Sequence, residues 1–305
     1  MLIVVALGGN ALLKHGDPPT AAAQRVNVRV AAAALARIAK GNDLVIVHGN
    51  GPQVGMLAMQ ADGFPLDVLV AETQGMIGYL IEQEMRRLLP KDRACVSLMT
   101  MVDVNEDDRA FTHPDKPIGP RYTAAQVACG SVAKGWTTVT EGDMVQRVVP
   151  SPKPVRILEI EPVQWLLRHG CVVICAGGGG IPVADSADGS THGVEAVIDK
   201  DRTASILAVA LNASLLVIAT DVPGIYEDWG GATQHLLAHA NPESLSRRHF
   251  EAGSMGPKVE ASCDFVNRTG KRAMIGSLDD IEAMVNGSAG TSIEPRIDMA
   301  FAEGP

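Results

Sequence analysis

The sequence predicts an α/β protein with a mainly parallel central sheet that helices cover on both faces. Apolar runs of strand length, such as residues 2–7 and 215–219, alternate with longer segments in which Ala, Val and Leu recur at helical spacing. Strands that are apolar on both faces are typical of parallel sheets whose connections are helices. Hydrophobic residues make up 46% of the chain and aromatic residues only 4%, so the expected core is built from small aliphatic side chains.

Each element follows from the local pattern. In chain order we expect a strand at 2–7, a helix at 20–40, a strand at 44–47, helices at 52–61 and 71–89, and a strand at 94–99. The alternation resumes with a helix at 160–169, a strand at 171–176, a helix at 201–212, a strand at 215–219, a helix at 257–268, a strand at 272–275 and a short helix at 278–285.

The segment 103–155 interrupts this alternation. It is rich in Asp, Pro, Gly and Thr, shows little periodicity, and is too long for an ordinary connection between two elements. We therefore expect residues 1–305 to form a single domain, with 103–155 as a small protruding lid subdomain that covers a site.

Composition and charge exclude several classes of protein. The net charge of −9 argues against a nucleic-acid surface, although cations gathered in a cleft could still bind an anionic substrate. Residues 1–7 lack a basic flank and run into glycines, which favours a first strand over a signal peptide. No apolar run reaches the roughly 18 residues of a membrane span. We expect a cytoplasmic protein without membrane or nucleic-acid partners.

The five cysteines, at positions 95, 129, 171, 175 and 263, form no Cys-x-x-Cys pair. This spacing favours ordinary thiols over disulfides or a zinc site.

Three glycine turns follow predicted strands, where α/β sheets bind their ligands. They are Gly8-Gly9-Asn10, Gly49-Asn50-Gly51 and Gly177 to Gly180. Glycine lets the backbone approach an oxyanion closely, and the N-terminus of a following helix favours negative charge. The spacing around Gly49 departs from the dinucleotide fingerprint, and the chain has no Walker A motif.

Each turn also has a simpler interpretation. Gly8-Gly9 could be a tight turn that binds nothing. Four successive glycines could be a linker, but this run lies between apolar residues, which favours a wall of N–H groups around a small anion. His48 is better explained as a packed residue than as a catalytic base.

Two lysines, Lys200 and Lys258, lie in loops where a catalytic role explains a lysine better than a contribution to solubility does. The chain has nine lysines, and Lys200 lies between Asp199 and Asp201 at the start of a predicted helix. Helix capping explains an aspartate there, but a lysine opposes the positive end of the helix dipole. Lys200 is therefore expected to face phosphate oxygens, with Asp201 orienting it, and Lys258 supports the same argument at another helix start. For Lys116, in a rigid Pro/Gly frame, a solvent-facing position remains an equal alternative.

In this order, the motifs resemble the amino acid kinase family and, within it, the carbamate kinases. The resemblance lies in residues 7–11, 48–55, 73–79, 116–120, 148–152, 177–183, 193–201 and 253–258. It extends to about residue 293, and we interpret the residues after 293 as an added extension.

The resemblance implies a three-layer αβα sandwich, a homodimer, and reversible phosphoryl transfer between ATP and carbamate that gives ADP and carbamoyl phosphate. It implies Mg²⁺ bound with the nucleotide. We further expect no metal held by the protein itself and a place in arginine metabolism, with purine or other nitrogen breakdown as open alternatives. Lys200 and Lys258 fall on the phosphate-bridging lysines, and Lys116 on the acceptor-side lysine of the lid. Asp201 would hold the lysines.

The remaining predicted site residues divide into two groups. Those expected at the substrate and phosphates are Gly8, Gly9, Asn10, Gly49, Asn50, Gly51, Gly178, Gly179 and Gly180. Those expected at the nucleotide are Thr220, Asp221, Tyr226, Ser254 and Met255.

One segment departs from the family pattern. Carbamate kinases usually carry several arginines before the Val-Val-Pro-Ser-Pro motif, whereas residues 140–147 contain one. Two alternatives therefore stay open: a relative that phosphorylates another small carboxylate or phosphate, and a nucleotide-binding regulator without turnover.

Overall fold

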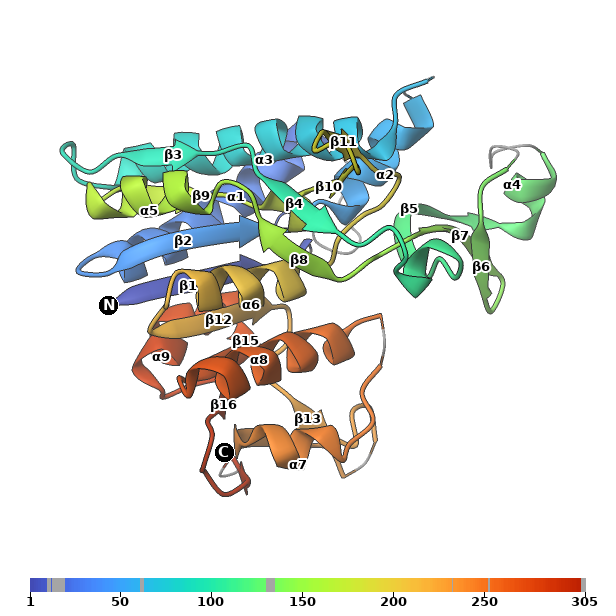
Figure 1. The fold of residues 1–305 in the computed structure, drawn as a ribbon. Helices are drawn as coiled ribbons and strands as arrows, with labels where there is room; N and C mark the ends of the chain where they lie inside the picture. Colours follow the sequence, from blue (N-terminus) through green and yellow to red (C-terminus); the bar gives the residue numbers. More distant parts are fainter. Residues whose placement is uncertain are drawn as a thin grey trace.

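A ten-stranded, mainly parallel sheet forms the centre of the molecule (Figure 1). The computed structural model describes residues 1–9, 12, 20–60, 63–129, 135–231, 233–251 and 253–302. The sheet order is β13-β14-β16-β15-β12-β1-β2-β9-β3, and β17 pairs with β14. All neighbours from β15 to β3 are parallel, while β16 is antiparallel to β15. The predicted fold class is confirmed.

The strands of this sheet agree with most of the predicted runs. They are β1 (Leu2–Leu7), β2 (Asp43–His48), β3 (Cys95–Ser97), β9 (Val172–Ile174), β12 (Leu215–Thr220), β13 (Tyr226–Glu227), β14 (His235–Ala240), β15 (Ala273–Ser277), β16 (Thr291–Ile293) and β17 (Ala300–Phe301).

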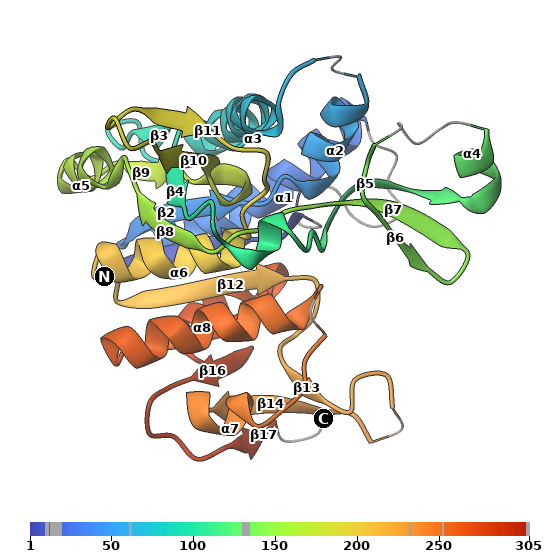
Figure 2. The ribbon, with the colours of Figure 1, turned by 45° about the vertical axis from the view of Figure 1, so that its right-hand side comes forward.

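Helices cover both faces of the sheet (Figure 2). One face carries α1 (Ala21–Ala39), α3 (Leu66–Leu88) and α9 (Ile281–Asn286), and the other carries α5 (Ile160–Arg168), α6 (Lys200–Ala210) and α8 (Met255–Thr269). The alternation along β1 shows this division: Ile3 and Val5 pack with the first group, and Val4 packs with the second. All three side chains are fully buried, so the molecule has three layers with a core on each side of the sheet.

The segment 103–155 is more regular than its sequence suggests. A four-stranded sheet contains β4 (Met101–Val104), β8 (Pro154–Ile157), β10 (Ile181–Asp185) and β11 (Thr191–Gly193). A second sheet of β5 (Lys116–Thr123), β7 (Met144–Val149) and β6 (Thr138–Glu141), with α4 (Ala124–Ala128), projects from the body (Figure 1). We call it the projecting sheet. The sequence pattern does not mark these strands, because β5 mixes exposed, half-buried and buried residues without alternation, β7 is partly buried along its length, and every residue of β6 is exposed.

The projecting sheet rests on helix α2 (Gly51–Gln60) through a close backbone contact. A Cβ at Gly55 would lie 2.0 Å from both Cα and N of Gly119 in β5, so this contact requires glycine. Val54, Ile118 and Val149 form a buried apolar cluster beside it. The position of β5 relative to the body is therefore fixed by packing.

The C-terminal part contains elements that the sequence did not reveal, namely β13, β14, α7 (Pro242–Ser246), β16 and β17. Residues 294–302 are folded onto the sheet edge, since β17 pairs antiparallel with β14 and Asn241 Nδ2 donates to the carbonyl of Ile297 at 2.9 Å. They are part of the domain rather than an appended tail.

All five cysteines are free thiols, as predicted. Cys129, at the end of α4, is exposed, Cys263 is half-buried, and the other three are buried. Among the described helices, none is both long and apolar enough to cross a bilayer.

Candidate active site

The first two glycine turns meet at the edge where β1, β2 and β12 end. The N–H of Gly8 donates to the Ala219 carbonyl at 3.0 Å, and that of Gly49 donates to the Leu7 carbonyl at 3.0 Å. A Cβ at Gly49 would lie 3.0 Å from N of Gly9 and 3.2 Å from Cδ of Lys200. Gly9, Gly49 and the Lys200 stem therefore lie against one another. Asn10, which we also predicted here, lies outside the described residues.

Helix α6 begins at this edge with a side-chain cap. Asp199 is its N-cap, and Oδ1 accepts the N–H groups of Asp201 at 2.9 Å and Arg202 at 3.3 Å. Capping is thus confirmed for Asp199. Asp201, in the first turn, is turned inward and its side chain is only 1% exposed.

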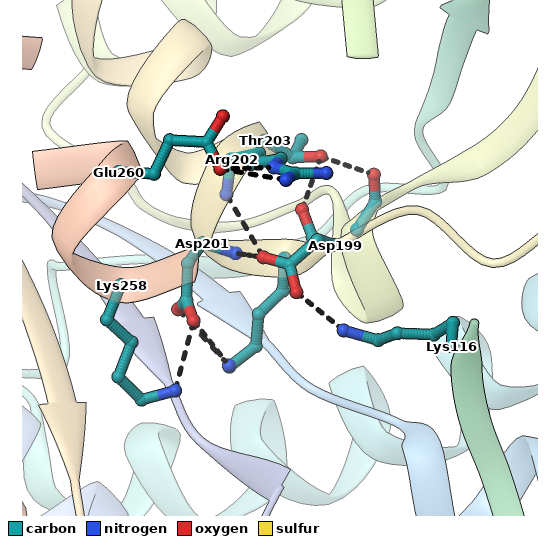
Figure 3. A network of polar contacts seen from close by, with 9 residues as sticks. Lys116, Asp199, Asp201, Arg202, Thr203, Lys258 and Glu260 are labelled. Carbon is teal, nitrogen blue, oxygen red and sulfur yellow. Dashed lines mark hydrogen bonds and ion pairs between the residues drawn. The ribbon is translucent and has the colours of Figure 1, made fainter. Parts of the chain in front are cut away.

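Asp201 contacts the ammonium groups of two lysines, Lys200 and Lys258, and Figure 3 labels the second of them. Nζ of Lys200 is 3.1 Å from Oδ1, and Nζ of Lys258 is 3.2 Å from Oδ2. The lysine side chains are 13% and 14% exposed. A carboxylate so deeply buried needs opposite charge nearby, and the two lysines supply it.

A third lysine reaches the cluster from the projecting sheet. Lys116 begins β5, and its Nζ lies 2.5 Å from Oδ2 of Asp199. In Figure 3, Lys116 and Lys258 approach the two aspartates from opposite sides. Three lysines and two aspartates leave a net charge of 3 − 2 = +1 in the cluster. Such a cluster favours an anionic ligand.

Lys200 and Lys258 differ in the direction of their pKa shifts. Burial alone would lower the pKa of Lys200, but Asp201 and Asp199 outweigh that effect and hold the pKa above its ordinary value. Burial and the neighbouring Lys200 charge lower the pKa of Lys258 despite its contact with Asp201. Burial would raise the pKa of Asp199, but Lys116 and Lys200 hold it well below the usual range. Of Lys200 and Lys258, Lys258 thus loses its proton more readily.

The third glycine turn has a clear packing explanation. The N–H groups of Gly179 and Gly180 donate to the carbonyls of Ala176 at 3.0 Å and Gly177 at 3.1 Å. This bonding argues against these two N–H groups as the anion donors that we predicted. A Cβ at Gly178 would lie 2.2 Å from Nδ2 of Asn50, and a Cβ at Gly179 would lie 2.2 Å from the Ile198 carbonyl oxygen.

Asn50 lies beside this glycine turn rather than among the lysines. Its Nδ2 donates to Oγ1 of Thr73 at 2.8 Å, and its side chain is buried. The described contacts of Asn50 therefore tie α2 to α3, and a direct role at the substrate stays a prediction.

The residues predicted for the nucleotide lie in two regions of the chain: one runs from the end of β12 to the start of β13, and the other is the start of α8. Thr220 ends β12, where its Oγ1 donates to Asp221 at 3.1 Å, and Tyr226 packs against Trp229 with ring centroids 5.0 Å apart. Ser254 and Met255 open α8, one turn before Lys258.

His48 is a packed residue, as predicted. It is 1% exposed, burial lowers its pKa to about 4, and a Cβ at Gly177 would lie 2.3 Å from its Nε2.

Two features of the site were missed. Asp199 pairs with Lys116 as well as capping α6. The Gln53 amide is buried, and neither of its polar atoms has a hydrogen-bond partner in the described part of the chain. Gln53 lies inside the glycine-turn motif at residues 48–55, and this position in the motif could have indicated that it belongs to the site.

Comparison with known proteins defines the class. Residues 1–277 match the amino acid kinase family. The chain belongs to the amino acid kinase family, and like its relatives it is a phosphotransferase.

Within that family, the similarity is to carbamate kinases. The chain is 51% identical to carbamate kinase of Haemophilus influenzae, with 98% of each protein covered, and 48% identical to that of Rhizobium meliloti, with 96% and 93% covered. Carbamate kinase of Giardia lamblia, solved with AMP-PNP bound, superposes with a TM-score of 0.86 at 36% identity, covering 97% of this chain and 98% of that one. The resemblance seen in the motifs is confirmed.

Proposed function

We propose that this protein is a carbamate kinase, which transfers a phosphoryl group reversibly between ATP and carbamate and gives ADP and carbamoyl phosphate. The observation that carries the proposal is the cluster of Lys116, Lys200 and Lys258 around two buried aspartates, at the edge where the parallel strands end. Its surplus positive charge suits the anionic phosphates and the anionic acceptor. The similarity to carbamate kinases over nearly the whole chain supports this acceptor.

The transfer is in line and forms no covalent enzyme intermediate. Lys200 and Lys258 neutralise the charge that spreads over the transferred group and its bridging oxygen, while Asp201 keeps both ammonium groups in place. We assign the backbone contacts to the N–H groups of Gly9 and Gly51, because the Gly8 N–H donates to Ala219.

Carbamate needs no general base, because its attacking oxygen is already anionic. Positioning the two substrates therefore carries much of the rate. Lys116, from the projecting sheet, binds the acceptor. In this proposal residues 103–155 act as the lid, which also excludes water from carbamoyl phosphate.

Mg²⁺ enters with the nucleotide in this proposal. Among the described residues no group of three His, Cys, Asp or Glu side chains is placed to hold a metal. Mg²⁺ is commonly bound through substrate phosphates and few carboxylates, which fits a site rich in lysine. When bound, it would neutralise part of the phosphate charge.

The assembly and the cellular context are further parts of the proposal. We propose a homodimer in the cytoplasm that acts in arginine metabolism. Light scattering on the purified protein tests the assembly, since a mass near that of one 32.1 kDa chain would contradict it.

The test of the activity is ATP formation from ADP, Mg²⁺ and carbamoyl phosphate by the purified protein. We expect robust ATP formation that requires all three. If ATP forms only with another acyl phosphate from a panel of small acids, the acceptor is wrong. If ADP binds and no ATP forms with any of them, the protein is a nucleotide-binding regulator rather than an enzyme.

A further inference from the structure

Asp199 makes a contact that the capping of α6 does not require. Its two carboxylate oxygens are divided between two tasks, because Oδ1 accepts the backbone N–H groups that cap α6, while Oδ2 lies 2.5 Å from Nζ of Lys116. We propose that Asp199 is a positioning residue, which holds the Lys116 ammonium at the acceptor side of the active site. This inference rests on the proposed function, since it assigns a partner to a lysine of the transfer site.

The burial of the pair supports a permanent contact. The Asp199 side chain is 7% exposed and that of Lys116 is 31% exposed. A buried carboxylate loses its hydration, and neutral N–H donors alone do not balance its charge. Lys116 supplies that balance from the projecting sheet, so the contact also joins this sheet to the start of α6 (Figure 3).

The contact fixes the position of the Lys116 ammonium but leaves N–H donors available for the substrate. A lysine ammonium is a point charge on a flexible four-carbon stem, so an unpaired Lys116 would sample many positions. It has three N–H donors, and one of them bonded to Asp199 leaves two for an acceptor carboxylate. Asp199 therefore reduces the freedom that Lys116 would otherwise lose on binding the substrate.

Asp199 also links the two halves of the site. One of the two N–H groups that its Oδ1 accepts belongs to Asp201, whose carboxylate contacts Lys200 and Lys258. One side chain thus fixes the acceptor-side lysine relative to the phosphate-side pair. Loss of its charge should impair the use of carbamoyl phosphate more than the binding of ADP.

The variant that separates the two tasks is Asp199→Asn. Asparagine caps helices as well as aspartate does, so its amide oxygen keeps the cap of α6, while the carboxylate oxygen and the charge that hold Lys116 are lost. We expect kcat/KM for carbamoyl phosphate to fall about 100-fold, as for a misplaced catalytic group, while the KM for ADP stays near the wild-type value. If Asp199→Asn does not fold, Asp199→Ser replaces it in the same kinetic measurement, because serine also caps helices and carries no charge.

A control and a double variant make the test specific. The control is Glu260→Gln, which removes a carboxylate of α8 that pairs with Arg202 in the first turn of α6. This variant should keep wild-type kinetics. In a Lys116→Met background, Asp199→Asn should cause little further loss, because its effect passes through Lys116. Wild-type kinetics for the single variant, or a full additional loss in the double variant, would overturn this inference alone. A wild-type protein that makes no ATP would instead overturn the proposed function.

Discussion

At the scale of single residues, Lys200 and Lys258 share one carboxylate but have different surroundings. We expect Lys200→Ala to remove about 3–4 kcal/mol of transition-state stabilisation, comparable to the loss of an oxyanion-hole donor, and to lower kcat/KM accordingly. Steady-state kinetics of ATP formation measures it. The matched control is Lys271→Ala, which removes a half-buried lysine whose ammonium donates to Asn212, at the end of α6 opposite the site. Near-normal turnover of Lys200→Ala would contradict the role of this cation.

The lowered pKa of Lys258 predicts an alkaline limit on activity. Because burial and the charge of Lys200 favour its neutral form, Lys258 should lose its proton below the ordinary lysine value of about 10.4, and kcat/KM should fall there. In Lys258→Arg the guanidinium does not titrate in this range, so the decline should move to higher pH. A decline that stays unchanged in Lys258→Arg would assign it to another group.

The sequence predicts those site residues whose role depends on their neighbours in the chain, and it does not predict contacts between distant segments. Lys200 and Lys258 were found because a lysine at a helix start conflicts with the helix dipole, which is a local rule. The contact between Lys116 and Asp199 joins residues 83 positions apart, and it depends on how the projecting sheet lies on the body. No local rule gives that placement.

At the scale of elements, the contact between α2 and β5 decides where Lys116 lies. We expect Gly55→Ala to push β5 away, because its Cβ would lie 2.0 Å from the Gly119 backbone. Activity should fall and proteolysis within residues 116–149 should increase, while the central sheet stays folded by circular dichroism. Gly75→Ala is the control, because Gly75 lies in an exposed turn of α3 and a Cβ there has no heavy atom within 4 Å. This variant should leave activity intact and stabilise the helix by roughly 0.5–1 kcal/mol. A fully active and protease-resistant Gly55→Ala protein would show that the contact does not position β5.

The elements that sequence patterns predicted are those buried on both faces. β1 and β12 are continuous apolar runs, and both are almost wholly buried. β5 and β6 carry threonine, proline and charged residues on exposed surfaces, so neither alternation nor an apolar run marks them. The composition marks the glycine run at 177–180, but its tight packing against Asn50 and Ile198 depends on tertiary contacts.

At the scale of the whole molecule, buried ionisable groups predict how stability depends on pH. The pKa of His48 is about 4 in the folded protein and 6.5 ordinarily, so between these values the unfolded chain binds more protons and the fold loses stability as pH falls. We expect a loss of about 2 kcal/mol between pH 7 and pH 5 from this group, measurable by urea unfolding. In His48→Gln this dependence should flatten, even if the variant is less stable overall.

A second decline should begin at lower pH. The folded-state pKa of Asp199 lies below its ordinary value of 3.8, so its stabilising contribution is present above that value and is lost as pH falls below it. Asp199→Asn should remove this part of the acid sensitivity, and an unchanged acid limb in that variant would contradict the assignment.

The distribution of cysteines has a practical consequence for following the enzyme at work. Burial raises the pKa of Cys263 to about 11 and those of Cys95 and Cys175 to about 12, and Cys171 is buried as well. Cys129 alone among the five is exposed, and it closes α4 at the far end of the projecting sheet. A maleimide dye should therefore attach there without any mutation, and its fluorescence would report in real time whether that sheet moves during a catalytic cycle.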